Sequence, residues 1–352
     1  MAGIKSFKKS FGKKPEGERL ERIEKSSNST NGKFQNVQPT AVSPDDVSMI
    51  TVLKDFMTRP KSVRPSAELP NVKTDLSQIS SDKPVIVWFG HSSYFIDFNG
   101  YRILVDPVFS GNASPVKFFG KSFRGADKYE VDDFPEIDLL ILTHDHYDHL
   151  DYPSIMKLKS KVKKIVTSLG VGAHLEYWGL EKMGITELDW WEDKRINEKL
   201  KITAAPARHF SGRGTTRFAT LWSSFILEFS AYKIYIGGDS GYSQQFKEIG
   251  RRFGPFDLAF MECGQYNENW PEIHMFPEQA VTAAKDLNAK IAIPVHWGKF
   301  TLSIHSWNEP VKRFVASAKK SGQQYVVPKI GEPYKLGEDF NQETWWNFEE
   351  KY

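Results

Sequence analysis

The chain has 352 residues, a formal net charge of +3, and hydrophobic and charged fractions of 40% and 26%, values of a soluble globular protein with one large domain or two ordinary ones. The small net charge gives no reason to expect a nucleic-acid partner, and a single cysteine, Cys263, excludes an intramolecular disulfide and a thiolate-rich zinc site. No window approaches the roughly 18 apolar residues of a membrane-spanning helix, and no signal peptide is expected, so we predict a cytoplasmic location.

The first 80 residues differ in composition from the rest. A Ser/Asn/Thr/Gly-rich stretch at 26–32 precedes proline-punctuated sequence, which predicts a partly extended N-terminal arm over 1–80 ahead of a folded domain over 81–352. The arm begins with a basic cluster of Lys5, Lys8, Lys9, Lys13 and Lys14. This cluster is either a solvated tail or a peripheral contact with anionic lipid, to which each well-placed lysine contributes about 1 kcal/mol.

From residue 84 onward, short apolar runs alternate with turn signals. The runs predict strands over 85–89, 94–98, 101–106, 138–143, 163–167, 200–205, 223–229, 232–237, 256–261 and 290–295. Helical periodicity is found at 172–183, 243–253, 277–288 and 308–320. Strands followed by helices, twice along the chain, indicate an α+β fold in which two sheets pack together and helices cover their outer faces.

The segment from Thr143 to His149 places three imidazoles and two carboxylates directly after an apolar run. So many ionisable groups at the end of a buried strand are costly unless an opposite charge lies among them. A metal ion is the simplest such charge.

Three other predicted strands end in the same kinds of residue. His209 follows the strand at 200–205, Asp239 follows 232–237, and His296 follows 290–295. Rigid strand ends commonly aim the side chains of a ligand site. Imidazole and carboxylate ligands without thiolate suit Zn²⁺, although Fe, Mn and Co use the same ligand types.

The ordered pattern His-x-His-x-Asp-His, then a distant His, an Asp and a further His, resembles the metallo-β-lactamase superfamily of binuclear hydrolases. The resemblance covers positions roughly 84 to 300 and implies an αββα sandwich with the site at the edge of the two sheets. It also implies two metal ions per chain. The first would be held by His144, His146 and His209, the second by Asp148, His149 and His296, and Asp239 would bridge both.

Several segments are similar to one branch of that superfamily, the N-acylphosphatidylethanolamine-hydrolysing phospholipases D: 32–36, 88–93, 104–110, 209–213, 220–222, 237–242, 252–259, 274–280 and 296–300. The branch implies hydrolysis of a phosphodiester in a lipid-like substrate, with Asp239 and a further histidine, His274, as catalytic residues. The chain departs from the branch at Phe276, where the phospholipase has an aspartate, and in a shorter segment after Arg213.

Substrate contacts are predicted from residues that flank the ligands. The guanidinium group of an arginine can donate two hydrogen bonds to one phosphate group, so Arg213 is the predicted phosphate contact. Three aromatic side chains would line an acyl-chain cleft, although such residues are equally typical of a core: Trp270, Phe276 and Trp297. His91 is expected to support the ligands through a hydrogen bond or to serve in packing, and Asp145 is expected either to support the ligands or to shape the loop.

Two other functions fit the same motif. A lactonase or carboxylic ester hydrolase would use the same activated water on a carbonyl carbon. A scaffold that binds metal without catalysis is the alternative from a different class, and the presence of all seven ligands argues against it. The sequence leaves the oligomeric state open.

Overall fold

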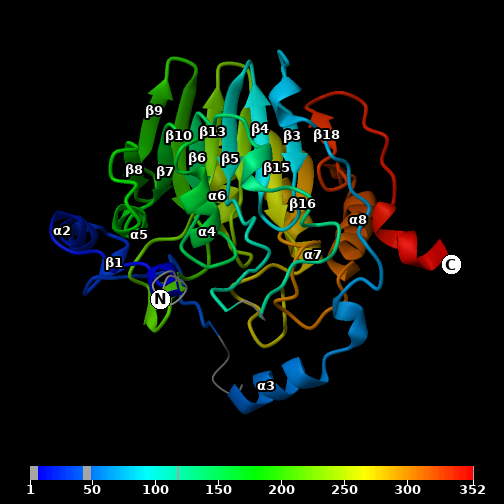
Figure 1. The fold of residues 1–352 in the computed structure, drawn as a ribbon, viewed down its shortest axis with the longest axis horizontal. Helices are drawn as coiled ribbons and strands as arrows, with labels where there is room; N and C mark the ends of the chain where they lie inside the picture. Colours follow the sequence, from blue (N-terminus) through cyan, green and yellow to red (C-terminus); the bar gives the residue numbers. More distant parts are fainter. Residues whose placement is uncertain (1–6, 43–48, 117–118, 352) are drawn as a thin grey trace.

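The computed structural model describes residues 7–42, 49–116 and 119–351, with the side chains of 49–53 and 349–351 left out. Lys5 of the predicted basic cluster lies outside the described residues. Two seven-stranded mixed sheets form the centre of the molecule (Figure 1). This is the α+β sandwich that the sequence predicted.

The first sheet has the strand order β18(Pro333–Lys335), β3(Val85–Trp88), β4(Tyr94–Phe98), β5(Tyr101–Val105), β6(Leu139–Leu142), β7(Ile165–Ser168) and β8(Ile185–Leu188). The second has the order β17(Gln324–Tyr325), β16(Ala289–Val295), β15(Phe256–Glu262), β14(Lys233–Ile236), β13(Ser223–Phe229), β10(Leu200–Pro206) and β9(Asp193–Asn197). Two short hairpins lie outside these sheets: β1(Ser29–Thr30) with β2(Lys33–Phe34), and β11(Gly212–Arg213) with β12(Thr216–Arg217).

Helices cover the outer face of each sheet. The first sheet packs against α4(Tyr152–Leu158) and α5(Gly172–Tyr177), and the second against α6(Gln245–Phe253), α7(Pro277–Asp286) and α8(Glu309–Ser321). The side chains of a strand alternate between the two faces. Thus Ile86 and Ile96 face the other sheet, whereas Val87 and Phe95 face the helices. Because both faces are buried, the central strands are mostly apolar, which made them easy to predict.

The elements that sequence reasoning missed are short or polar. Strands β8 and β9 are only partly buried, and three of the five residues of β9 are exposed, so they lack the apolar run of a central strand. Helix α4 has a single buried turn that begins after Asp151. The helix predicted over 172–183 ends at Tyr177, since Gly179 takes a φ of 86° that breaks it.

The N-terminal arm lies along one edge of the sandwich, where it appears in blue in Figure 1. It contains α2(Glu18–Lys25) and α3(Met49–Thr58), and the β1–β2 hairpin lies between them in the chain. The described side chains of Ile23 and Phe34 are completely buried against Leu169, Trp190 and Trp222 of the domain. The arm is therefore packed onto the domain through apolar contacts in this part.

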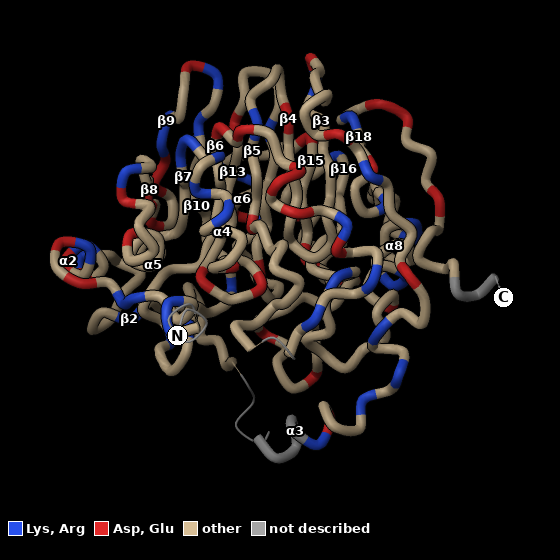
Figure 2. The backbone as a smooth tube through the Cα atoms, viewed as in Figure 1, with Lys and Arg blue, Asp and Glu red and all other residues tan. Residues whose placement is uncertain are grey.

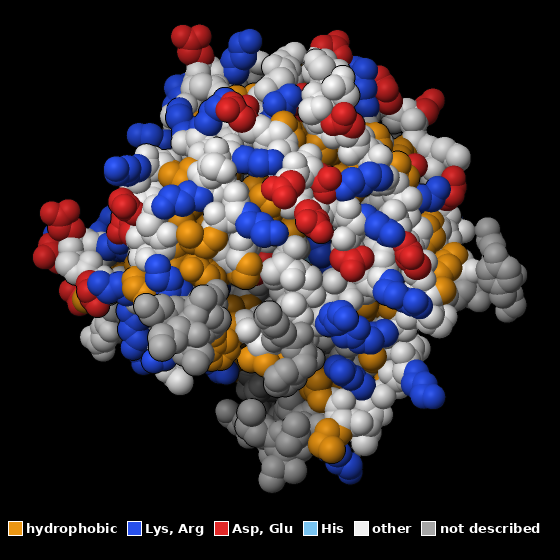
Figure 3. Space-filling view, in the orientation of Figure 1, with side chains coloured by type: hydrophobic (Ala, Val, Ile, Leu, Met, Phe, Trp, Pro, Cys, Tyr) orange, Lys and Arg blue, Asp and Glu red, His pale blue; other side chains and the backbone are white. Residues whose placement is uncertain are grey.

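Charges of both signs are interspersed over the face of the molecule seen in Figures 2 and 3. The described lysines of the predicted basic cluster, from Lys8 to Lys14, are exposed. Among the helices that the structure describes, none combines the length and the apolar character needed to cross a lipid bilayer.

Candidate metal centre

Side chains from four strand ends converge on one carboxylate, that of Asp239. Its Oδ2 lies 3.1 Å from His149 Nε2, 3.7 Å from His209 Nε2 and 3.8 Å from His144 Nε2. Its Oδ1 lies 2.9 Å from His296 Nδ1. The four imidazoles come from the loops after β6, β10 and β16, and Asp239 from the loop after β14. The structure thus brings the ends of both sheets to a common point.

One group of potential ligands consists of His144, His146, His209 and Asp239. His146 Nδ1 lies 3.0 Å from His144 Nε2 and 3.2 Å from His209 Nε2. One imidazole nitrogen carries either a proton or a lone pair, so it does not form two good hydrogen bonds with two other ring nitrogens. Ring nitrogens around a tetrahedral zinc ion are roughly 3.3 Å apart, from a Zn–N distance of about 2.0 Å. The observed spacing therefore fits a cation among the three rings.

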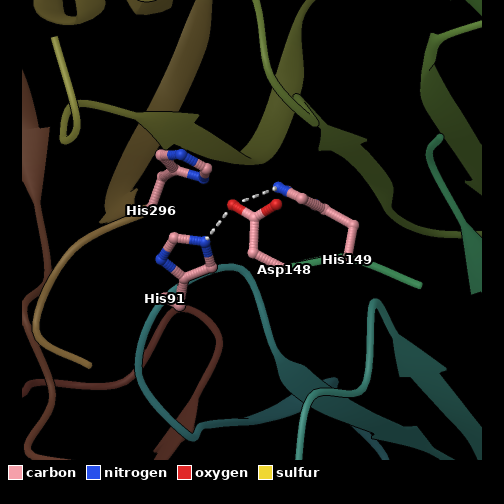
Figure 4. A group of neighbouring side chains, drawn as sticks. All are labelled: His91, Asp148, His149 and His296. Carbon is pink, nitrogen blue, oxygen red and sulfur yellow. Dashed lines mark hydrogen bonds and ion pairs between the residues drawn. The ribbon is translucent and has the colours of Figure 1, made fainter. Parts of the chain in front are cut away.

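A second group consists of His91, Asp148, His149 and His296 (Figure 4). Asp148 Oδ2 lies between two imidazoles, 2.9 Å from His91 Nε2 and 3.7 Å from His149 Nε2. The rings of His91 and His296 are 4.1 Å apart at their centroids. His91 was expected only to support the ligands or to serve in packing. It nevertheless belongs to the same close group as the predicted ligands Asp148, His149 and His296.

Buried nitrogens without hydrogen bonds also fit a metal. His149 Nε2 and His91 Nδ1 are both buried, and neither makes a hydrogen bond. A buried polar atom without a partner costs roughly 1–3 kcal/mol. A bound cation would remove this cost at His149, whose Nε2 points toward Asp239.

The protonation states of the rings suit metal binding. Burial, reinforced by neighbouring histidines, holds the pKa of His144 well below its usual value, and burial does the same for His209 against the opposing charge of Asp239. Neutral imidazoles keep the lone pair that a metal needs. His149 differs: burial lowers its pKa, but the carboxylates of Asp239 and Asp148 raise it further, to well above the usual value. Positive charge is therefore favoured at the position between these two carboxylates.

Neighbouring groups fix how the ligands are presented. His209 Nδ1 donates to the carbonyl of Ile273 at 2.8 Å, which leaves Nε2 free for a metal. His149 Nδ1 lies 2.8 Å from Asp106 Oδ2, and Asp106 also accepts hydrogen bonds from the backbone N–H and hydroxyl of Thr143. Such partners orient ligands and raise their basicity. Asp106 is a functional residue that sequence reasoning missed.

Asp145, between two of the ligands, turns away from them. Its Oδ1 accepts from Gly212 N at 2.7 Å, and its Oδ2 accepts from the Thr220 hydroxyl at 2.9 Å and lies 3.2 Å from His174 Nε2. Burial would raise its pKa, but the hydrogen bond and charge of His174 outweigh this and lower it. Asp145 therefore shapes the loop, as the sequence predicted.

His274 lies at the open side of the centre. Its ring centroid is 5.0 Å from that of His209, and its side chain is 13% exposed, against 1% for His209. His274 Nδ1 lies 2.9 Å from Oε2 of Glu262, a completely buried residue at the end of β15. Burial lowers the pKa of His274 to about 3, and burial together with Asp239 raises that of Glu262 well above the usual value. Glu262, like Asp106, was not predicted from the sequence.

The residues that were missed share features visible in the sequence. Glu262 ends β15 and Asp106 directly follows β5, so the rule of looking at strand ends would have found both. His91, which was expected in a supporting role, follows β3 within three residues. His91, Asp106 and His296 also have positive φ angles of 54°, 40° and 67°. Non-glycine residues in this region are strained and cluster at functional sites, but their φ angles are not readable from sequence.

Arg213 does not have the role that the sequence predicted. Its guanidinium is 5% exposed and donates to the carbonyls of Asp145 at 2.7 Å, Leu150 at 2.8 Å and Ser10. The group also stacks on the rings of Tyr147 and Trp178. These carbonyls accept hydrogen bonds from the N–H groups of the guanidinium, so Arg213 holds the motif loop and the arm together. The prediction that Arg213 contacts a phosphate group is therefore wrong.

Trp297 is also wrong as a substrate contact. It is completely buried, its indole N–H donates to Pro294 O at 2.9 Å, and it packs against Trp88, Trp307 and Trp345. The other two aromatic predictions remain untested: Trp270 is partly buried and stacks on Phe56, and Phe276 starts α7 beside Tyr266.

Comparison with known proteins agrees with this geometry. The family model of the beta-lactamase superfamily domain matches residues 101–297. The chain belongs to the metallo-β-lactamase superfamily. An uncharacterized protein of Mycobacterium tuberculosis is 36% identical over 328 residues, which cover 92% of this chain and 88% of that protein.

Two further relatives place the chain within the superfamily. N-acyl-phosphatidylethanolamine-hydrolyzing phospholipase D 1 of Caenorhabditis elegans is 31% identical over 228 residues, covering 61% of this chain and 64% of that enzyme. The structure of a metallo hydrolase from Ignicoccus hospitalis superimposes with a TM-score of 0.55 at 20% identity, over 73% of this chain and all of that chain. The metallo-β-lactamase fold predicted from the sequence is thus confirmed, and the protein is a metal-dependent hydrolase.

Proposed function

We propose that the protein is a binuclear zinc-dependent phosphodiesterase of the phospholipase D type, which acts on N-acylphosphatidylethanolamine or a related phosphodiester. The observation that carries the proposal is a pair of His/Asp groups: the first contains Asp239, and the second contacts it through His149 and His296. Two ions held by one bridging carboxylate would lie close enough to act on the same phosphodiester, as two-metal sites about 3.5–4 Å apart do.

The ligand types favour zinc. Histidine nitrogens outnumber carboxylates among the seven predicted ligands, and none is a thiolate. Mn and Fe accept the same ligands and are the alternatives. Bound divalent ions of this kind supply Lewis acidity and lower the pKa of water to about 7.

The protein's own residues would orient the reaction. Asp239 would be held in place as a ligand shared by both ions, because its loop is fixed by the hydrogen bond from Ser240 N to Glu262 Oε1 at 2.9 Å. His274, with its Nδ1 engaged by Glu262, would present Nε2 to the substrate and pass a proton to the leaving oxygen. Such a proton transfer contributes about 10²–10⁴-fold to the rate.

A cavity of about 920 Å³ beside the motif loop supports a lipid-like substrate, although none of the predicted metal ligands lines it. Its wall includes Phe109, Pro115 and Val116 together with Tyr147, Asp151 and Arg213. The volume lies at the upper end of typical ligand pockets. Exposed Phe7 and Phe11 beside the lysines of the arm favour peripheral contact of this edge with a membrane.

The decisive experiment is metal-dependent turnover on matched substrates. Purified protein is dialysed against a chelator and assayed on N-acylphosphatidylethanolamine vesicles, on bis(p-nitrophenyl) phosphate and on a panel of lactones and carboxylic esters, with and without added Zn²⁺. We expect loss of phosphodiester cleavage after chelation and its return with Zn²⁺. Turnover that is indifferent to the chelator would overturn the proposal.

The same assay separates the alternatives. Activity restored by Zn²⁺ on lactones or esters alone would make the protein a lactonase or ester hydrolase. Two metal ions per chain without turnover on any member of the panel would favour a metal-binding scaffold.

A further inference from the structure

The N-terminal arm contacts both loops that carry the first ligand group, His144, His146 and His209. Residues 9–13 of the arm lie against the motif loop and α5, and residues 36–41 lie against the loop that carries His209. Figure 1 shows the arm in blue at the edge of the sandwich where these loops gather. The arm therefore surrounds this ligand group from two sides.

The contact with His209 is made by a single side chain, that of Asn36. Its Nδ2 donates to the carbonyl of His209 at 2.7 Å, and its Oδ1 accepts from the N–H of His209 at 3.1 Å and from the indole N–H of Trp222 at 3.2 Å. The amide thus pairs with both backbone groups of one ligand. Two hydrogen bonds to one residue fix the direction of its backbone and, with Nδ1 held by Ile273, the position of its ring.

The contact with the motif loop passes through His174 and Arg213. The N–H of Lys13 donates to His174 Nδ1 at 3.0 Å, so His174 Nε2 carries the proton that it shares with Asp145 at 3.2 Å. The guanidinium of Arg213 bridges the carbonyl of Ser10 to those of Asp145 and Leu150. Asp145 lies between the ligands His144 and His146 in the chain. Through His174 and Arg213, the arm therefore supports the hydrogen bonds of Asp145.

The arm is anchored away from the ligands as well. Arg19 of α2 donates to Glu187 at 2.6 Å and to both carboxylate oxygens of Glu176 at 2.7 and 3.0 Å. Ile23 and Phe34 are completely buried. These contacts hold the arm in the place from which Asn36 reaches His209.

We propose that the arm is part of the metal centre: Asn36 is a positioning residue for His209, and arm docking and metal binding at the first ligand group strengthen each other. The inference rests on the proposed binuclear metal centre. Coupling between two binding events is reciprocal, so the metal must hold the arm in place as much as the arm holds the ligands.

The first test measures metal affinity in the full-length protein. Metal-free wild type, Asn36→Ala and Gln35→Ala are titrated with Zn²⁺ in competition with a chromophoric chelator. Gln35 is the matched control, since its exposed side chain bonds only to the carbonyl of Lys33. We expect Asn36→Ala to weaken one of the two binding events by about 10- to 100-fold, the usual effect of losing a ligand's hydrogen-bond partner, and to leave the other unchanged. Gln35→Ala should match the wild type.

The second test is the reciprocal one. Trypsin cleavage within the arm is followed in metal-free and Zn²⁺-loaded protein, with Arg19→Ala as a variant that loosens the arm without touching a ligand loop. We expect Zn²⁺ to slow arm cleavage in the wild type several-fold and to protect Asn36→Ala less. Arg19→Ala should be cleaved faster and should bind Zn²⁺ more weakly at one site.

The outcomes separate this inference from the proposed function. If the wild type binds no Zn²⁺, the metal centre itself fails. If the wild type binds two ions and Asn36→Ala binds both as tightly, while arm cleavage ignores Zn²⁺, the centre stands and the role of the arm is refuted. Thermal melting of the metal-free variants, followed by circular dichroism, shows whether each variant is folded. If Asn36→Ala is not folded, the same measurements on Arg19→Ala decide the question.

Discussion

At the scale of single residues, Asp239 is the carboxylate on which the imidazoles of the centre converge. Four imidazole nitrogens lie within 3.8 Å of its two carboxylate oxygens. Burial would raise its pKa, but His149 and His296 outweigh this and hold it well below the usual value. The side chain is therefore an anion at neutral pH, placed between the two ligand groups.

Removal of this carboxylate should abolish both metal sites. We expect Asp239→Ala to retain less than one ion per chain, because each group loses its shared anion, and to lose nearly all hydrolytic activity. Metal analysis of the dialysed protein checks this, with Asp193→Ala on the exposed edge strand β9 as the control. Two tightly bound ions in Asp239→Ala would rule out the bridging assignment.

Lys299 is a buried residue that the metal centre does not explain. Its ammonium group donates to Phe89 O at 3.2 Å and lies over the ring of Phe109, and the residue is 2% exposed. Burial lowers its pKa from 10.5 to about 7. Between these two pH values the unfolded chain binds a proton that the folded protein releases, so the free energy of unfolding should rise as the pH rises through this window.

Replacement of this lysine by an uncharged residue of similar length tests the argument. Lys299→Met should be more stable than the wild type near pH 7, and the difference should shrink toward pH 11, above the usual pKa of 10.5, where the wild-type lysine is mostly neutral in both states. Urea unfolding at a series of pH values measures this, and Lys247→Met on the exposed face of α6 is the control. A constant difference across the series would contradict the assigned pKa.

At the scale of elements, the end of β15 joins the loop of Asp239 to the loop of His274. Glu262 Oε1 accepts from the N–H groups of Ser240 and Met275, at 2.9 and 3.0 Å, while Oε2 faces His274 Nδ1. In Glu262→Gln the amide oxygen can keep the two backbone bonds, and the NH₂ group would then donate to Nδ1. Like a protonated Glu262, this amide leaves a proton on Nε2, but it cannot release a proton to Nδ1 when Nε2 gives its own to the leaving oxygen.

Both changes at this pair should slow turnover without loss of metal. We expect His274→Ala and Glu262→Gln each to lower kcat by about 10²-fold, the low end for acid–base groups, and the double variant to be no slower than His274→Ala, since the two residues act as a unit. Single-turnover kinetics with metal analysis test this, with exposed Glu268→Gln as the control. Additive losses would mean that Glu262 acts independently of His274.

The elements that sequence predicts well are those whose pattern is set by burial on both faces. Strand β13 has the predicted bounds, and β6, β10 and β16 differ from prediction by one or two residues at an end, so the ligands after them were found. Edge strand β9 was missed because half-exposed charged residues carry no apolar pattern. The roles of Arg213 and Trp297 were mistaken for a different reason, since spacing along the chain does not show whether a side chain faces substrate or core.

At the scale of the whole molecule, the metal centre lies at the meeting point of both sheets and the arm. The ligands come from the loops after β6, β10, β14 and β16, and the arm adds Asn36 to the backbone of His209. A cation at this point would join parts of the chain that are far apart in sequence. Its binding free energy therefore belongs to the stability of the entire fold.

Metal removal should accordingly lower the melting temperature of the whole protein in one transition. An ion present at 100 times its Kd stabilises by about 2.7 kcal/mol, and for a large domain each kcal/mol corresponds to about 2–4 °C, so two ions predict a shift on the order of 10 °C. Calorimetry of dialysed protein with excess chelator or saturating Zn²⁺ measures it, and Asp239→Ala should show almost no shift. Equal melting temperatures in chelator and in Zn²⁺ would mean that the buried carboxylates and imidazoles are stable together without a cation. That result would contradict the electrostatic argument from which the metal centre was assigned.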